Sequence, residues 1–67
     1  MTQRKMSATV RRLRKAKSMT QAELAKKARV TQGYIAQIEA GTIKELGAKV
    51  ALRLADALGV PVTELVG

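Results

Sequence analysis

The sequence contains no cysteine and no histidine, and its only aromatic residue is Tyr34. The chain therefore lacks the residues for disulfide bonds, for thiolate or imidazole metal sites and for histidine acid–base catalysis. Its core has to be built from aliphatic side chains, and this palette favours helices. With 67 residues the chain has room for one small domain.

Acidic residues are also few. Five Asp and Glu stand against 13 Lys and Arg, which gives a net charge of +8. A charge of this size attracts polyanions, namely nucleic acid or acidic lipid. Most of the Lys and Arg precede Val30, whereas the last third of the chain is nearly balanced. Charge alone leaves open whether the basic surface binds a polyanion or is simply solvated.

Long apolar runs and catalytic constellations are missing as well. No apolar run approaches the roughly 20 residues that span a membrane, and residues 1–5 are not followed by the apolar core of a signal peptide. We therefore expect a cytoplasmic protein with no membrane partner. The acidic residues are scattered and no nucleophile–base pair is present, so we expect no enzymatic activity, no metal, no cofactor and no small-molecule substrate.

Breaks in the apolar pattern divide the chain into about five short helices, which predicts a compact all-α bundle. Ser7 is expected to cap the first helix. We therefore predict a flexible basic N-terminal arm over residues 1–6 and a single domain over residues 7–67. The breaks fall near residues 17–19, 29–30, 41–47 and 59–61.

The joint between the second and third helices is the most informative feature. Thr20 and Glu23 have the spacing of a capping box, which starts the second helix, and Thr31 is a good cap for the third. Only Arg29 and Val30 separate the two helices. Short helices joined so closely must cross at a steep angle, which is the geometry of a helix-turn-helix.

The third helix is predicted to run from Thr31 to Ala40 and to end at Gly41 in a left-handed conformation. Ile35 and Ile38 should point into the core. The side chains left on the outer face are polar but uncharged, and a glutamine amide matches the hydrogen-bonding edge of adenine in the major groove. These outward positions are Gln32, Gly33, Ala36 and Gln37.

The last third of the chain predicts two further helices. A fourth helix should run from Ala48 to Leu58 and end at Gly59, and Pro61 should open a short fifth helix over residues 62–66. The inward positions expected for the fourth helix are Ala48, Ala51, Leu54, Ala55 and Leu58. Candidates for contacts with a second copy of the chain are Leu52, Val62, Leu65 and Val66.

The segment from Met19 to Gly41, MTQAELAKKARVTQGYIAQIEAG, closely resembles the Cro and CI type of helix-turn-helix found in lambdoid phage repressors and many bacterial regulators. The resemblance extends back to Leu13 and forward to Val60. It implies a lambda repressor-like fold and a transcriptional regulator, most often a repressor, that binds double-stranded operator DNA as a homodimer. The helix from Thr31 to Ala40 would lie in the major groove.

The resemblance also implies roles for single residues. Gln32 and Gln37 stand where the family reads base edges, and Gly33 occupies a third reading position without a side chain. Arg14 and Glu39 match an ion pair that ties the first helix to the third. Contacts with the DNA backbone are implied for Gln21, Thr31, Tyr34, Lys44 and Arg14.

The sequence departs from the family at two places. Arg29 stands in the turn where relatives usually carry glycine, and a left-handed backbone there would cost about 1 kcal/mol. Residues 42–49 lack the proline-containing loop that is common in the family, which leaves the start of the fourth helix open.

Several functions stay open at this point. The same domain serves antitoxins and restriction–modification controllers. A basic protein that binds RNA or other polyanions without sequence preference is a further possibility, although Tyr34 alone offers little aromatic surface for stacking bases. A protein-interaction module that keeps the fold without binding DNA is the third.

Overall fold

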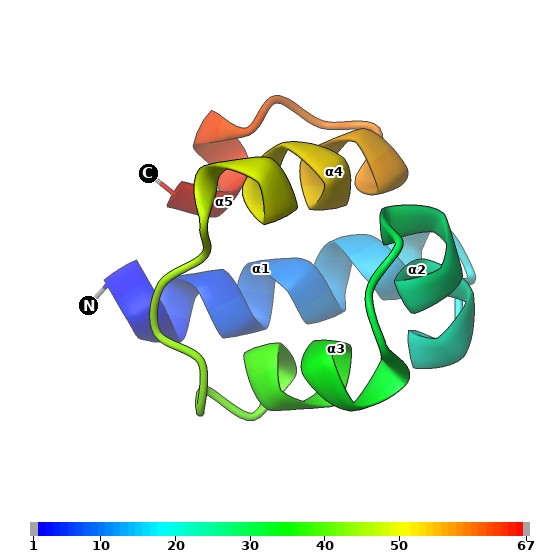
Figure 1. The fold of residues 1–67 in the computed structure, drawn as a ribbon, viewed down its shortest axis with the longest axis horizontal. Coiled ribbons are helices and arrows are strands. Elements are labelled where there is room, and N and C mark those ends of the chain that lie inside the picture. Colours follow the sequence, from blue (N-terminus) through cyan, green and yellow to red (C-terminus); the bar gives the residue numbers. More distant parts are fainter. Residues whose placement is uncertain (1, 67) are drawn as a thin grey trace.

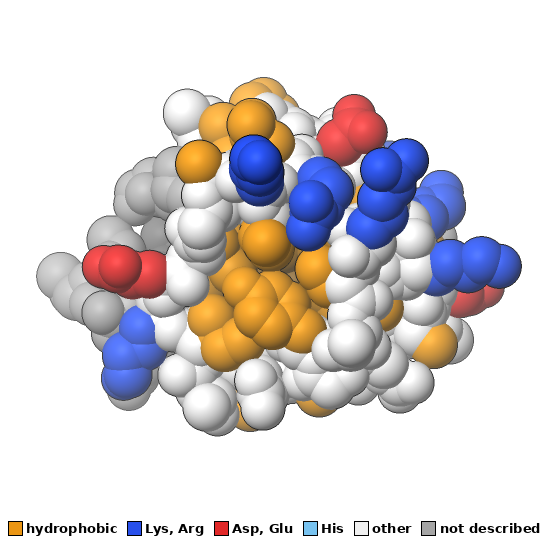
Figure 2. Space-filling view, viewed as in Figure 1, with side chains coloured by type: hydrophobic (Ala, Val, Ile, Leu, Met, Phe, Trp, Pro, Cys, Tyr) orange, Lys and Arg blue, Asp and Glu red, His pale blue; other side chains and the backbone are white. Residues whose placement is uncertain are grey.

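The computed structural model describes the backbone of residues 2–66 and the side chains of residues 6–65. Helix α1 crosses the middle of the molecule, with α3 on one side, α4 and α5 on the other and α2 at one end (Figure 1). Apolar side chains fill the space framed by α3, α4 and the loop between them (Figure 2). The predicted all-α bundle is confirmed. Its helices are α1 Thr2–Ala16, α2 Gln21–Ala28, α3 Gln32–Glu39, α4 Ala48–Leu58 and α5 Thr63–Val66.

Helix α1 begins earlier than predicted. Its first residue is Thr2, so the prediction that Ser7 caps this helix is wrong, and residues 2–6, assigned above to an arm, belong to α1. Met6 is 5% exposed and Val10 is fully buried. These residues lie four apart on one helix face, so burying Met6 favours extending the helix past Ser7. Met1 of the predicted arm lies outside the described residues.

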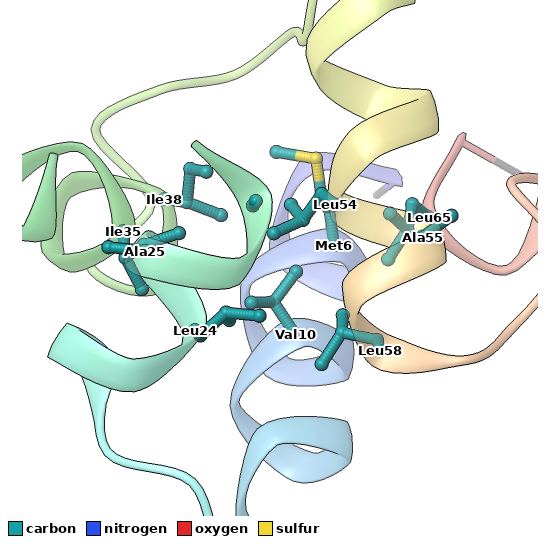
Figure 3. Packing of buried hydrophobic residues seen from close by; sticks show 11 residues of the cluster. Met6, Val10, Leu24, Ala25, Ile35, Ile38, Leu54, Ala55, Leu58 and Leu65 are labelled. Carbon is teal, nitrogen blue, oxygen red and sulfur yellow. The ribbon is translucent and has the colours of Figure 1, made fainter. Parts of the chain in front are cut away.

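The hydrophobic core draws on all five helices, as Figure 3 shows for ten labelled side chains. The predicted burial of Ile35, Ile38 and Leu54 is confirmed. Ala48 was expected to point inward but is exposed. It directly follows the helix N-cap, and the buried stripe of α4 begins one turn later, at Ala51.

The two caps predicted for the helix-turn-helix are both present. The Thr20 hydroxyl accepts a hydrogen bond from the Glu23 amide at 3.1 Å, and the Glu23 carboxylate accepts one from the Thr20 amide at 2.8 Å. The Thr31 hydroxyl accepts a hydrogen bond from the Tyr34 amide at 3.1 Å. Each cap satisfies amides that a helix start leaves unpaired, which fixes where α2 and α3 begin.

The turn between α2 and α3 closes tightly around Arg29. Its backbone is left-handed, with φ 61° and ψ 44°, so Arg29 adopts the conformation for which relatives usually carry glycine. The Arg29 amide donates to the carbonyls of Ala25 and Lys26, and the Val30 amide donates to Ala25 at 2.9 Å. These hydrogen bonds offset a steric cost of about 1 kcal/mol for a side chain in this conformation.

The loop over residues 42–47, which the sequence left open, is attached to the end of α3. The amides of Thr42 and Ile43 donate to the Gln37 carbonyl at 2.9 and 3.3 Å. Ile43 and Leu46 are half-buried against the core. Gly41 and Gly59 adopt positive φ values of 82° and 70°, consistent with their predicted positions after α3 and α4.

Candidate nucleic-acid interface

The outer face of α3 is polar and carries no charge. Gln32, Gly33 and Gln37 are exposed, whereas Ile35 and Ile38 on the opposite face are fully buried. On the face drawn in Figure 2, Lys and Arg side chains lie over α4 and the nearby end of α2. The α3 face therefore offers amide donors and acceptors, which suit hydrogen bonding to base edges better than attraction of phosphates.

A buried ion pair holds the C-terminal end of α3. Arg14 donates from Nε to Glu39 Oε2 at 2.6 Å and from Nη2 to Glu39 Oε1 at 2.9 Å. The Arg14 and Glu39 side chains are only 12% and 3% exposed. Arg14 also donates from Nη1 to the Met19 carbonyl at 2.9 Å. One guanidinium thus joins α1, the segment before α2 and the end of α3.

Two more side chains converge on Glu39. Gln21 Nε2 donates to Glu39 Oε1 at 3.3 Å, so the first residue of α2 contacts the last residue of α3. Arg11 Nη2 donates to the Glu39 carbonyl at 3.0 Å, and Arg11 Nε lies 3.7 Å from Glu39 Oε1. The contacts of Arg11 were not predicted from the sequence. The spacing of three between Arg11 and Arg14 on one face of α1 was the available signal.

The structure brings only some of the predicted site residues together. Gln21 and Arg14 meet at Glu39 beneath α3, while Thr31 is exposed at the start of that helix. Lys44 is exposed in the loop after α3, and Tyr34 is half-buried with its ring against the core. Three N–H groups of Arg14 already have protein acceptors, so the geometry favours its structural role over a phosphate contact.

A comparison with protein families shows to which family the chain belongs. A family model described as helix-turn-helix matches residues 10–65, which includes α2, the turn and α3. The chain belongs to the Cro/CI-type helix-turn-helix family. Members of this family are DNA-binding transcriptional regulators. In this chain α2, the turn and α3 form the helix-turn-helix, and α3 has the position of the recognition helix in such motifs.

Solved structures with the same helix-turn-helix fold include two bacterial regulators. The restriction-modification controller protein C.AhdI from Aeromonas hydrophila is 31% identical, with a TM-score of 0.85 and 92% of each chain covered. The clp gene regulator ClgR from Corynebacterium glutamicum is 31% identical, with a TM-score of 0.82, and the match covers 97% of this chain and 83% of the other. No curated protein matches the sequence significantly.

The helix-turn-helix is held by an ionised Glu39. Burial raises the pKa of the Glu39 carboxyl, but hydrogen bonds from Arg14 and Gln21 and the positive charges of Arg14 and Arg11 outweigh burial and lower this pKa below its usual value. The hydrogen bond with Glu39 raises the pKa of Arg14, although burial opposes this. Both shifts favour the charged pair in the folded state.

We predict that acid weakens the helix-turn-helix through Glu39. Because the pKa of Glu39 is lower in the folded than in the unfolded chain, its stabilisation is complete above the unfolded pKa of about 4.3 and is lost as the pH falls through the folded value. The melting temperature should therefore stay level between pH 7 and 5 and fall below about pH 4. Thermal unfolding followed by circular dichroism measures this.

The matched variant for the acid effect is Glu39→Gln, which keeps the shape of the side chain without a titrating group. Its melting temperature should be lower near pH 7 and depend less on pH in the acid range. Equal acid slopes for the variant and the unchanged chain would show that other carboxylates cause the effect.

No helix among the described residues is long and apolar enough to cross a membrane.

Proposed function

We propose that this chain binds a specific sequence of double-stranded DNA by inserting the recognition helix, from Thr31 to Ala40, into the major groove. The observation that carries the proposal is the division of α3 into two faces. Ile35, Ile38 and Glu39 fix the inner face, while Gln32, Gly33 and Gln37 stay exposed. The amide N–H of a glutamine can donate to N7 of adenine while its carbonyl oxygen accepts from the N6 amino group, so the adenine edge satisfies both ends of the amide.

Contacts with the DNA backbone would set the position of this helix. We propose this role for Gln21, Thr31, Tyr34 and Lys44, which lie at the starts of α2 and α3, within α3 and in the loop after it. Gln21 uses one N–H of its amide on Glu39 and has a second for a phosphate. We leave Arg14 out of this set because three of its N–H groups bind Glu39 and Met19 and its side chain is only 12% exposed.

The proposal includes a homodimer on a two-fold operator. A single helix-turn-helix domain offers little interface for tight specific binding, and paired half-sites lie about one helical turn apart in complexes of this kind. Leu52 on α4 is 58% exposed, the one large hydrophobic side chain so exposed among the described residues. We propose that copies pair through the α4–α5 side around Leu52 and Val62. Leu65 is only 3% exposed and closes the core instead.

Repression of transcription in the cytoplasm is the biological role that we propose for this binding. The control of a restriction–modification system is a specific variant, supported by the match to C.AhdI over 92% of both chains, although ClgR is equally identical to this chain. Binding of single-stranded RNA is disfavoured because the single aromatic ring, that of Tyr34, is half-buried against the core. We propose that the chain acts by binding and catalyses no reaction.

The test is a selection of duplexes from a random pool with the full chain, followed by fluorescence anisotropy with the selected duplex and a scrambled one at two salt concentrations. Because base contacts depend on salt less than phosphate contacts, the preference for the selected duplex should persist at the higher salt. Equal and strongly salt-sensitive binding to both duplexes would indicate a non-specific polyanion-binding protein instead.

A further inference from the structure

The structure of the protein itself does not explain why residue 33 is a glycine. It lies inside α3, where glycine is less favourable than alanine because it loses more backbone entropy on folding. Its φ is not positive, unlike those of Gly41 and Gly59. A Cβ atom added to Gly33 would meet nothing within 4 Å. Within the described residues, neither backbone geometry nor packing requires position 33 to lack a side chain.

Because Gly33 has no side chain, the helix backbone is uncovered on the exposed face of α3. Gly33 and Gln37 are four residues apart and therefore lie on the same face of α3, and Gln32 is the neighbour of Gly33 on the exposed side. The backbone of α3 is thus bare beside two glutamine side chains. A partner bound by these glutamines would come closest to the helix axis at Gly33.

We propose that Gly33 makes room for the methyl group of a thymine in the operator, the thymine that is paired with an adenine bound by Gln32 or Gln37. This inference rests on the proposed function. Every adenine in a duplex is paired with a thymine, whose C5 methyl projects into the major groove. That methyl occupies the space that a Cβ at Gly33 would fill. The chain therefore gives up some helix stability for a closer approach to DNA.

The experiment exchanges one methyl group for another. Gly33→Ala adds a methyl to the protein, and replacing a thymine by uracil in both half-sites removes one from the DNA. The probe is the duplex selected by the unchanged full chain, made in a series with each thymine replaced in turn. Affinity is measured by fluorescence anisotropy and stability by thermal unfolding without DNA.

The variant should melt higher and bind more weakly. We expect Gly33→Ala, in the first turn of α3, to raise the melting temperature by up to about 4–8 °C. It should weaken binding to the thymine duplex about tenfold, because the added methyl and the thymine methyl would need the same space. One uracil replacement should restore at least about fivefold of that loss for the variant while weakening binding of the unchanged chain. The matched control is Gly47→Ala at the N-cap of α4, where an added Cβ also meets nothing within 4 Å. It should leave the affinity within about twofold.

Equal affinities of Gly33→Ala and the unchanged chain for the thymine duplex would overturn the inference and leave the proposed function standing. A loss of affinity that no uracil replacement relieves would also overturn it, because the group near Gly33 would then not be a thymine methyl. Failure of the unchanged chain to select any duplex would instead reject the proposed function, and the inference with it.

Discussion

Replacing Glu39 by alanine is expected to remove a large part of the free energy of unfolding of the chain. The substitution leaves Arg14, which is 12% exposed, without its carboxylate partner, and breaking a buried ion pair in this way costs about 3–5 kcal/mol. A domain of this size has a total stability of about 3–10 kcal/mol. The melting temperature should fall by about 15 °C or more, measured by circular dichroism.

The matched control for this variant is Glu45→Ala, which removes the same charge from an exposed position. Exposed side chains outside caps and networks usually change stability by less than about 0.5 kcal/mol. Similar melting temperatures for the two variants would contradict the structural importance of the Glu39 network. A large fall for Glu39→Ala alone would show that the network, rather than net charge, fixes α3 against α1 and α2.

The limits of most helices could be predicted from the sequence because short-range chemistry sets them. Thr20 with Glu23 and Thr31 supply hydroxyl and carboxylate groups within four residues of the amides that they satisfy. Gly41 and Gly59 mark helix ends through their positive φ values. These signals need no knowledge of the rest of the fold.

The start of α1 could not be predicted in the same way. Ser7 is a plausible cap in isolation, and only the burial of Met6 among residues distant in sequence shows that the helix continues to Thr2. The prediction that Ala48 points inward is wrong for a related reason. The direction in which the first turn of α4 faces depends on the loop that precedes it.

In the candidate site, too, features set by local sequence could be predicted and contacts between distant residues could not. The exposed positions of Gln32 and Gln37 follow from helical periodicity, although their roles in reading bases stay predictions. The ion pair of Arg14 with Glu39 was predicted from the family resemblance, and the structure contains it. The contacts of Arg11 and Gln21 with Glu39 span 28 and 18 residues. The spacing of Arg11 from Arg14 places both on one face of α1, but a local pattern of this kind does not identify Glu39 as their partner.

The double variant Gln32→Ala/Gln37→Ala is expected to lose most of its preference for the selected duplex. Each glutamine contact with a base is worth about 1–3 kcal/mol, so the two together should cost about 2–6 kcal/mol on that duplex if they add. Binding to a scrambled duplex should change little, because it depends on phosphate contacts. Both side chains are exposed, so the melting temperature without DNA should stay close to that of the unchanged chain. Fluorescence anisotropy on the two duplexes measures the ratio of affinities.

Lys44→Ala provides the contrasting control, because Lys44 is exposed in the loop after α3 and would contact a phosphate rather than a base. This variant should weaken binding to both duplexes alike and reduce the slope of log affinity against log salt by about one. The two variants therefore separate loss of sequence preference from loss of general affinity. A double glutamine variant that keeps the full ratio of affinities would mean that sequence is read outside the face formed by Gln32, Gly33 and Gln37. Recognition would then rest on the shape of the DNA and on contacts from the loop, and α3 would serve mainly to position them.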